Sequence, residues 1–397
     1  MTKTEKIKKF LEKHKHLPEQ RSEDWINQRR SKFGGSEIHH IIRLKNTNIN
    51  NFVNNFLYKK LIPQTNPFIF PCVFGNIFEN EIKNLSEYNF NTKIYETGSI
   101  KYEKLKCVSY SPDGFGIVND EIVLFEFKCP ITREINKEEI KFEYLMQVNS
   151  GLHVLEEVVE NKGLYIEAEF KKCTLDELTD DNSFDKIFHN KNLNRDFSEL
   201  YKHFGMILFY EETEPVNAAN DVIDLGDASI IKMETLFYNV YKKKFKYLYL
   251  SDIINDNNSD IINDNNSDII NDNNYDIIND NNSDIINDNN SDIIKKYISN
   301  VYSGNKKLFN KEEINYLKGM LINECIKKKY NPLYILPWKC FNYNVIEVKK
   351  NNDFFTDELK ERCLYFSYIV KYIATLNLEN EEEIKQLLLK YTKQYLK

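Results

Sequence analysis

The sequence has no Cys-x-x-Cys pair and no long apolar run. Its seven cysteines are dispersed, at positions 72, 107, 129, 173, 325, 340 and 363. Because zinc sites use closely spaced cysteines and disulfide frameworks use even numbers of them, this pattern argues against both. The first ten residues lack the apolar segment of a secretion signal, and no stretch has the length that spans a bilayer. We therefore expect an intracellular protein with reduced thiols that is neither secreted nor bound to a membrane.

The chain also lacks a net positive charge, because 54 Lys and Arg face 61 Asp and Glu and give a net charge of −7. Eleven of the Asp lie in residues 251–294, which contain no Lys, Arg or Glu. Without these eleven charges the net charge of the remaining chain becomes +4. A mildly basic chain is compatible with a polyanionic partner, so the acidic total does not exclude a nucleic acid.

Residues 251–294 consist of the octad Ser-Asp-Ile-Ile-Asn-Asp-Asn-Asn, repeated five times with Tyr275 in place of one Ser and followed by a truncated copy. The octad contains no glycine, which argues against the calcium-binding coils whose turns need it. Asn and Asp disfavour the interiors of helices and strands. We therefore predict a low-complexity insert without fixed structure, and leave open an acidic decoy that competes with DNA for a basic groove.

What the sequence does contain is one strand, 122–128, on which the rest can be organised. Ile122, Leu124, Glu126 and Lys128 share one face, and Val123, Phe125 and Phe127 share the other. Apolar residues on both faces are typical of a central strand covered on both sides. Such a strand needs partners for a carboxylate and an amine at its end, and the candidate is Asp113 in the preceding Pro-Asp-Gly turn.

Two carboxylates at a sheet edge form an oxygen-lined site suited to magnesium, which takes one or two protein carboxylates together with water and substrate phosphate. Lys128 points to the same side as Glu126, where it can hold or deprotonate a metal-bound water or stabilise charge on a phosphate. This arrangement indicates phosphodiester hydrolysis. The alternative is a surface hairpin in which Glu126 and Lys128 form a weak ion pair.

Four further residues are candidates. Arg29 and Ser36 flank a Gly-Gly pair before a short helix, a pattern that lets a phosphate approach free backbone N–H groups. Glu79 lies beside the apolar stripe of a helix that begins near residue 74, and Gln147 lies beside that of a helix over 138–160. Each of the four is also compatible with an ordinary surface or boundary position.

The order of the elements predicts an α/β protein. Strands are expected at 164–170, 204–211, 334–341 and 345–349, and helices at 229–249, 295–330, 355–376 and 379–396. Strands and helices that alternate around a central strand favour a mixed sheet flanked by helices. We divide the chain into a first core part, 1–212, a helical insertion with the octads, 213–330, and a completing part, 331–397.

Five motifs occur together in residues 20–170: Trp25-x3-Arg29-x6-Ser36, Gly75-x2-Phe78-Glu79, Ser111-Pro112-Asp113-Gly114, Phe125-Glu126-Phe127-Lys128-Cys129-Pro130 and Tyr144-x2-Gln147. Their order and spacing resemble the phage lambda exonuclease and YqaJ-type viral recombinase nucleases, members of the PD-(D/E)xK superfamily. Leu336-Pro337-Trp338-Lys339 is similar to the closing part of such nucleases in large DNA viruses. The chain departs from the family at Gly34-Gly35-Ser36, where Thr-Ala-Ser is common.

The resemblance implies a restriction-endonuclease-like core and a set of roles. Asp113, Glu126 and the carbonyl of Phe127 would bind Mg²⁺ or Mn²⁺, and Lys128 would be the catalytic lysine. Glu79 would be an accessory acid and Gln147 an active-site residue on a helix. Arg29 and Ser36 would form the pocket for a 5′-phosphate.

The function expected from this resemblance is a metal-dependent 5′→3′ exonuclease that acts on the ends of double-stranded DNA and supplies single strands for recombination, repair or genome processing. The family also implies two partners, a single-strand annealing protein and further copies of the chain in a ring-shaped trimer. Alternatives are a structure-specific endonuclease on the same core and a non-catalytic DNA-binding protein. An iron–sulfur relative is disfavoured because Cys325, Cys340 and Cys363 are too dispersed for a cluster.

Overall fold

The computed structural model describes residues 1–18, 22–25, 32–62, 68–179, 203–216, 221–226, 230–254, 293–297 and 309–397. Within them, the larger sheet consists of β4 Gly114–Val118, β5 Glu121–Lys128, β6 Lys162–Lys172, β7 Phe204–Glu211, β8 Ile223–Asp224, β9 Lys246–Tyr249 and β10 Asn331–Lys349. The strand order is β4-β5-β6-β10-β7-β9, and β8 pairs with β10. A smaller sheet has the order β1-β3-β2, with β1 Phe33–Gly34, β2 Ile100–Lys101 and β3 Val108–Tyr110.

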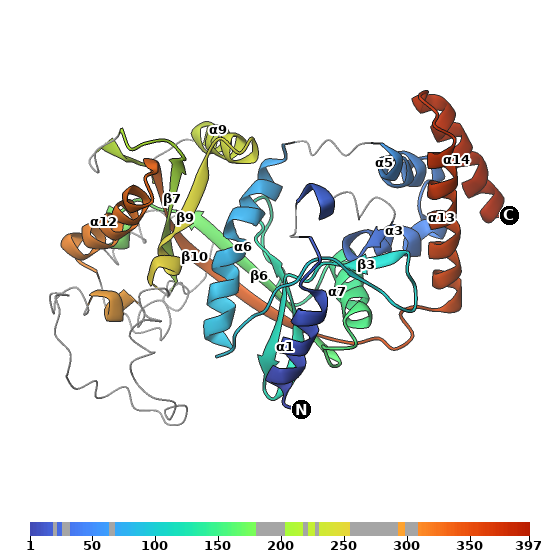
Figure 1. Cartoon of the computed structure of the whole chain (residues 1–397), viewed down its shortest axis with the longest axis horizontal. Helices are drawn as coiled ribbons and strands as arrows, with labels where there is room; N and C mark the ends of the chain where they lie inside the picture. Colours follow the sequence, from blue (N-terminus) through green and yellow to red (C-terminus); the bar gives the residue numbers. More distant parts are fainter. Residues whose placement is uncertain are drawn as a thin grey trace.

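Helices lie on both faces of the larger sheet (Figure 1). The α-helices of the described residues are α1 Lys3–His14, α3 Ile38–Ile42, α4 Ile49–Phe52, α5 Tyr58–Leu61, α6 Phe70–Asn89, α7 Phe142–Val154, α9 Ile230–Tyr241, α12 Lys311–Lys327, α13 Asp357–Thr375 and α14 Glu381–Tyr395. Shorter turns are η1 Gly35–Glu37, η2 Arg43–Asn46, η3 Val53–Leu57 and η4 Asp176–Leu178. The predicted α/β class, with a mixed central sheet flanked by helices, is confirmed.

Strand β5 is buried on both faces and separates two hydrophobic clusters. It pairs with β4 in the antiparallel and with β6 in the parallel direction. Val123, Phe125 and Phe127 pack into one cluster with α6, β7, α9 and α12. Ile122 and Leu124 pack into the other with α1, α7, α13 and α14. The two-residue alternation predicted from the sequence is therefore observed, because successive side chains of this strand pack into different hydrophobic clusters.

The two helices that cover β5 are α6 on one face and α7 on the other. Helix α6 begins with Pro71 in its first turn, where the missing N–H group costs no helical hydrogen bond. Its buried stripe includes Phe74, Ile77, Phe78, Ile82 and Leu85, at helical spacings of three and four. Helix α7 is shorter at both ends than the expected 138–160, since it begins at Phe142 and ends at Val154.

Strand β10 joins the two halves of the larger sheet. Its first part pairs with β7, from Asn331 to Lys339, and its second part pairs with β6, from Trp338 to Lys349. A register shift lies between Cys340 and Asn342. Figure 1 shows β10 as one long arrow that runs from the side of α12 toward α13. The C-terminal part of the chain therefore completes the sheet that the N-terminal part begins.

Two expectations for the middle of the chain need correction. Residues 246–249 form β9 rather than the end of a helix, because their backbone pairs with the edge of β7 and Tyr247 and Tyr249 favour a strand. Both ends of the octad segment are folded, since 251–254 and 293–297 are helical. Ser251, Ile254 and Ile294 are buried there. Residues 255–292, with most of the octads, lie outside the described residues.

None of the helices in the described parts of the chain is long and apolar enough to cross a membrane. The division of the chain at 212 and 330 stays a prediction, although β8 and β9 show that the described part of 213–330 contributes strands to the sheet as well as helices.

Two helical glycines make the packing of the core testable. A Cβ added at Gly151 in α7 would lie 2.6 Å from Cζ of Tyr110 and 2.7 Å from Cδ2 of Leu124, whereas one added at Gly319 in α12 would have no atom within 4 Å. We expect Gly151→Ala to lower the free energy of unfolding by about 1–3 kcal/mol through overpacking. Gly319→Ala should raise it by up to about 1 kcal/mol through helix propensity. Urea denaturation of both variants measures the difference, and equal stabilities would contradict the packing of Tyr110 against α7.

Candidate active site

The carboxylate of Glu126 is the most enclosed polar group of the site. Glu126 is 0% exposed and lies near the end of β5. Its Oε1 accepts hydrogen bonds from Nζ of Lys128 and from Nε2 of Gln147, and its Oε2 accepts one from the hydroxyl of Tyr110. Donors from β5, α7 and β3 thus converge on a single carboxylate, and they satisfy the hydrogen-bonding requirement of its burial.

Asp113 reaches the same strand from the turn that precedes β4. Its Oδ2 accepts a hydrogen bond of 2.7 Å from the backbone N–H of Phe127. This bond places the carboxylate of Asp113 beside the peptide that links Glu126 to Phe127. The structure therefore brings together the three charged residues that the sequence singled out.

Lys128 is the cation of this group. Its ammonium donates to Glu126 and, at 3.0 Å, to the carbonyl of Phe127. Burial disfavours the charge of Lys128, but the carboxylates of Glu126 and Asp113 outweigh burial and raise its pKa above the ordinary value. The Tyr144 ring of α7 lies 5.4 Å from the same ammonium, a distance that allows a cation–π contact.

Tyr110 donates a hydrogen bond to Glu126 from β3, and two glycines leave space for its ring. A Cβ at Gly35 would lie 2.3 Å from Cδ2 of Tyr110, and one at Gly151 would lie 2.6 Å from its Cζ. Burial, followed by the charges of Glu126 and Asp113, raises the pKa of Tyr110 well above its ordinary value. The phenol therefore stays protonated and acts as a donor. From the sequence, the Gly34-Gly35 pair was expected to let a phosphate approach. In the structure, Gly35 is the surface against which the ring of Tyr110 packs.

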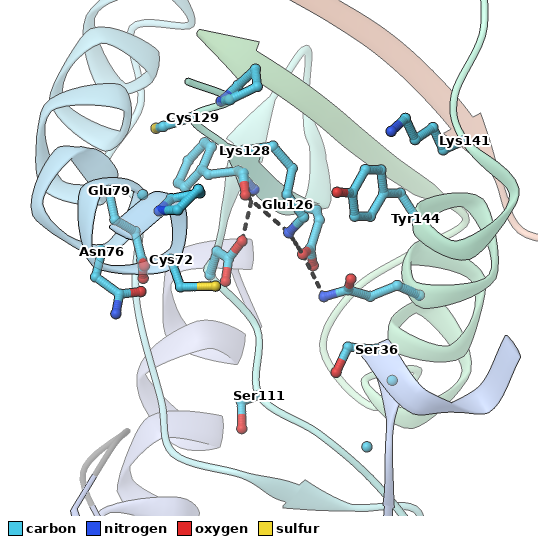
Figure 2. A pocket seen from close by; sticks show the side chains of 18 of the residues that line it. Ser36, Cys72, Asn76, Glu79, Ser111, Glu126, Lys128, Cys129, Lys141 and Tyr144 are labelled. Carbon is cyan, nitrogen blue, oxygen red and sulfur yellow. Dashed lines mark hydrogen bonds and ion pairs between the residues drawn. The ribbon is translucent and has the colours of Figure 1, made fainter. Parts of the chain in front are cut away.

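These groups open into a pocket of about 720 Å³. Figure 2 shows Glu79 and Asn76 entering it from α6, Tyr144 from α7, and Glu126 and Lys128 from the strand between them. Ser36 and Glu79 line the pocket, so both candidates lie at the site. Arg29 lies outside the described residues.

Trp25 ties the N-terminal segment to this pocket. Its backbone N–H donates to Oγ of Ser22 at 3.2 Å, as at a helix N-cap. Its indole N–H donates to Oγ of Ser111 at 3.0 Å. Trp25 and Gly34 both line the pocket, on either side of Arg29 in the sequence.

Two pocket cations were not predicted from the sequence, Arg133 and Lys141. Arg133 forms an ion pair with Glu167 of β6, and the hydroxyl of Tyr165 donates to the same carboxylate at 2.6 Å. Burial opposes the charge of Arg133, but the hydrogen bond to Glu167 raises its pKa. Glu167, in the apolar strand predicted at 164–170, was a signal for such a cation, because a buried carboxylate requires a cation nearby.

The oxygen atoms of this site suit a hard divalent cation. Two of the proposed ligands, a carboxylate oxygen of Glu126 and the carbonyl of Phe127, already contact one positive group, the ammonium of Lys128. They are therefore within reach of a single cation, and the carboxylate of Asp113 lies beside them. Carboxylate and carbonyl oxygens are the donors that magnesium prefers. Within the described residues, no group of three or more His, Cys, Asp or Glu side chains is gathered for a metal.

Comparison with known proteins gives a family for part of the chain. Residues 24–157, which contain Asp113, Glu126, Lys128 and Gln147, match the model of the YqaJ-like viral recombinase domain. The resemblance to YqaJ-type nucleases is thereby confirmed for this part of the chain. No match was found among the curated proteins.

Some solved structures are also similar. The alkaline exonuclease LHK-Exo from Laribacter hongkongensis is 19% identical, with a TM-score of 0.31, over 37% of this chain and 74% of that one. Its complex with dAMP is 20% identical, with a TM-score of 0.32, over 37% and 73%. The structure of SSO0001 is 13% identical, with a TM-score of 0.22, over 42% and 70%.

The hydrogen bond from Tyr110 to Glu126 can be tested by the substitution Tyr110→Phe. The ring remains, but Oε2 of the buried carboxylate loses its donor. An unsatisfied buried acceptor costs about 1–3 kcal/mol, so the free energy of unfolding should fall by that amount. Tyr238→Phe on α9, with an exposed ring, is the control and should change stability little. Wild-type stability of Tyr110→Phe in chemical denaturation would show that Glu126 does not depend on this donor.

Proposed function

We propose that this chain is a divalent-metal-dependent deoxyribonuclease that digests linear duplex DNA from its ends in the 5′→3′ direction. The observation that carries the proposal is the meeting of Asp113, Glu126, Lys128 and Gln147 in one pocket. The match of residues 24–157 to the YqaJ-like viral recombinase domain supports it, and two of the similar structures are of an alkaline exonuclease.

In this proposal Asp113, Glu126 and the carbonyl of Phe127 hold Mg²⁺ or Mn²⁺. A divalent cation bound there would polarise the phosphate and lower the pKa of a coordinated water. Glu126 and Asp113 supply the negative charge that retains the cation, and Gln147 and Tyr110 fix the orientation of Glu126. Lys128 lies close enough to both oxygen ligands to hold the attacking water or a phosphate oxygen. Water attacks phosphorus, the bond to the 3′ oxygen of the neighbouring nucleotide breaks, and that oxygen takes up a proton.

Glu79 and Ser36 take supporting roles in the proposal. Glu79 enters the pocket from α6 as an accessory acid, and Ser36 binds the terminal 5′-phosphate together with Arg29. The product would be single-stranded DNA for recombination, repair or genome processing. A single-strand annealing protein as partner and a ring-shaped trimer remain predictions from the family.

The proposed chemistry predicts a graded loss of activity. Asp113→Asn, Glu126→Gln and Lys128→Ala should each reduce magnesium-dependent release of nucleotides by a factor on the order of 10³ or more, because residues that act as a unit fail together. Gln147→Ala should cost about 10- to 100-fold, since it removes only the group that orients Glu126. Asp120→Asn changes a carboxylate that is 95% exposed and should leave activity unchanged.

The measurement is the release of label from end-labelled linear duplex, with magnesium and with a chelator. Circular dichroism and urea denaturation of each variant establish that it is folded. Near-normal activity of a folded Glu126→Gln or Asp113→Asn variant would refute the assignment of the metal ligands. Wild-type activity that persists in the chelator would refute metal dependence.

The direction of digestion predicts a preference for 5′-phosphorylated ends. A charge-assisted hydrogen bond contributes about 1.5–3 kcal/mol, so Arg29→Ala should slow digestion of phosphorylated ends by roughly 10- to 100-fold. Ends with a 5′-hydroxyl should be affected far less, because they offer no phosphate to that contact. Arg30→Ala removes the same charge one residue away and serves as the control. Equal wild-type rates on both kinds of end, with efficient cutting of closed circles, would favour the endonuclease instead.

A further inference from the structure

Helix α13 carries an apolar stripe on its solvent side. Leu364, Tyr368, Tyr372 and Leu376 follow one another at intervals of four along α13 and its C-terminal cap, so they share one face. Leu364 is 56% exposed and Tyr368 is 65% exposed. The opposite face packs into the core through Leu359, Cys363, Phe366, Ile369, Val370 and Ile373. The stripe is therefore additional to the face that the fold uses, and exposed apolar surface of this extent marks binding sites.

The two tyrosines of the stripe are arranged as a stacking platform. Their ring planes differ by only 9°, and their centroids are 6.3 Å apart. The two rings are thus stacked rather than edge to face, and Tyr368 is the more exposed of them. An exposed ring at the end of such a stack is suited to a planar ligand that extends it.

Positive charge lies beside this platform. Lys371 lies between Tyr368 and Tyr372 in the sequence and is exposed, as is Lys101 of β2. Burial, followed by the charges of Lys101 and Lys371, lowers the pKa of Lys32 to about 8. The three ammonium groups therefore lie near one another, and among the described residues none of them forms an ion pair with a carboxylate. We call Lys32, Lys101, Lys371, Tyr368 and Tyr372 the α13 patch.

Two lysines of the α13 patch lie close in the sequence to residues that line the pocket. Lys32 immediately precedes β1, and Gly34, Gly35 and Ser36 line the pocket. Lys101 lies two residues after Ser99, which also lines it. Strands β1 and β2 flank β3, which carries Tyr110, a donor to Glu126. The small sheet therefore connects the pocket to Lys32 and Lys101, and the charge of Lys371 that acts on Lys32 connects these lysines to α13.

We infer that the α13 patch binds single-stranded nucleic acid, with phosphates on the lysines and bases stacked on Tyr368 and Tyr372. A single strand supplies both groups, because its phosphates are anionic and the faces of its bases are open. Duplex DNA hides its base faces and leaves the tyrosines unused. A second copy of the chain, docked by a two-fold axis on this stripe, would bring the lysine clusters of both copies together, which is unfavourable. The inference rests on the proposed function, since digestion of one strand of a duplex leaves the other as a single strand.

Binding is measured with the full-length protein in a chelator, by fluorescence anisotropy of a short labelled oligodeoxyadenylate. Stacking contributes about 1–3 kcal/mol per base, so the double variant Tyr368→Ala and Tyr372→Ala should bind at least about 5- to 30-fold more weakly. The double variant Lys101→Ala and Lys371→Ala should also lower the slope of log K against log salt by about 1.4, since each phosphate contact on a single strand contributes about 0.7. The tyrosine variant should leave this slope unchanged.

The matched control is the double variant Tyr238→Ala and Lys242→Ala at the C-terminal end of α9. It removes the same residue types, with Tyr238 42% exposed and Lys242 5.5 Å from its ring. Figure 1 shows α9 and α13 on opposite sides of the molecule. Affinity should not change in this control. Equal loss in the control and in the patch variants would overturn the inference, because it would indicate general rather than local binding.

Titration of Lys32 gives an independent readout. Lys101 of β2 and Lys371 of α13 face this ammonium and disfavour its charge, whereas a bound phosphate favours it. Binding therefore takes up a proton, and affinity should fall as the pH rises through about 8. Lys32→Arg keeps the charge without the titration and should flatten this dependence. An unchanged pH dependence in Lys32→Arg would remove Lys32 from the patch.

Failure of the inference and failure of the proposed function are distinguishable. Patch variants that cleave linear duplex and also bind single strands like the wild type would overturn the inference alone. Absence of magnesium-dependent cleavage, with strand binding that still depends on the patch, would overturn the nuclease proposal alone. Patch variants that change the mass of the protein in solution, with unchanged strand affinity, would show that α13 is an interface between copies.

Discussion

The arrangement of this molecule depends on the burial of one carboxylate, that of Glu126. A carboxylate without access to water is tolerated only when donors surround it, and here three donors come from three separate elements. Lys128 belongs to the same strand, Gln147 to α7 and Tyr110 to β3. Satisfying Glu126 therefore fixes where α7 and the small sheet lie relative to β5. Removing one donor weakens the compensation of a buried charge, so structure and site are sensitive to the same contacts.

The part of this arrangement that could be predicted from the sequence is the part that local periodicity determines. In β5, Val123 and Phe125 face one core and Ile122 and Leu124 the other, as a two-residue period requires. The turn that carries Asp113 is also local, since Asp113 and Glu126 are only 13 positions apart in the printed sequence. The roles of these residues in catalysis are not determined by such patterns and rest on the experiments above.

Other features depend on partners that are distant in the sequence. The ring of Tyr110 fits only because Gly35 and Gly151 lack side chains, and no periodic pattern links these three positions. The sequence predicted two strands here, 334–341 and 345–349, separated by Asn342, Tyr343 and Asn344. In the structure Pro337 pairs with Met206 of β7, and the register shift between Cys340 and Asn342 lies within the pairing of β10 with β6. Residues 331–349 form one continuous strand because they pair with β6 and β7 on either side.

Charge is distributed differently inside the pocket and outside it. Within it, Lys128 is paired with Glu126 and Arg133 with Glu167, so these cations neutralise the protein's own carboxylates. They add little net attraction for a polyanion that approaches from solvent. The lysines of the α13 patch have no carboxylate partner among the described residues, and burial, together with the charges of Lys101 and Lys371, lowers the pKa of Lys32. In the inferred mode of binding, these lysines rather than the paired cations of the pocket attract the strand. Such a separation lets salt weaken the binding of the strand without disturbing the buried contacts of Glu126, because ions screen exposed charges much more than buried ones.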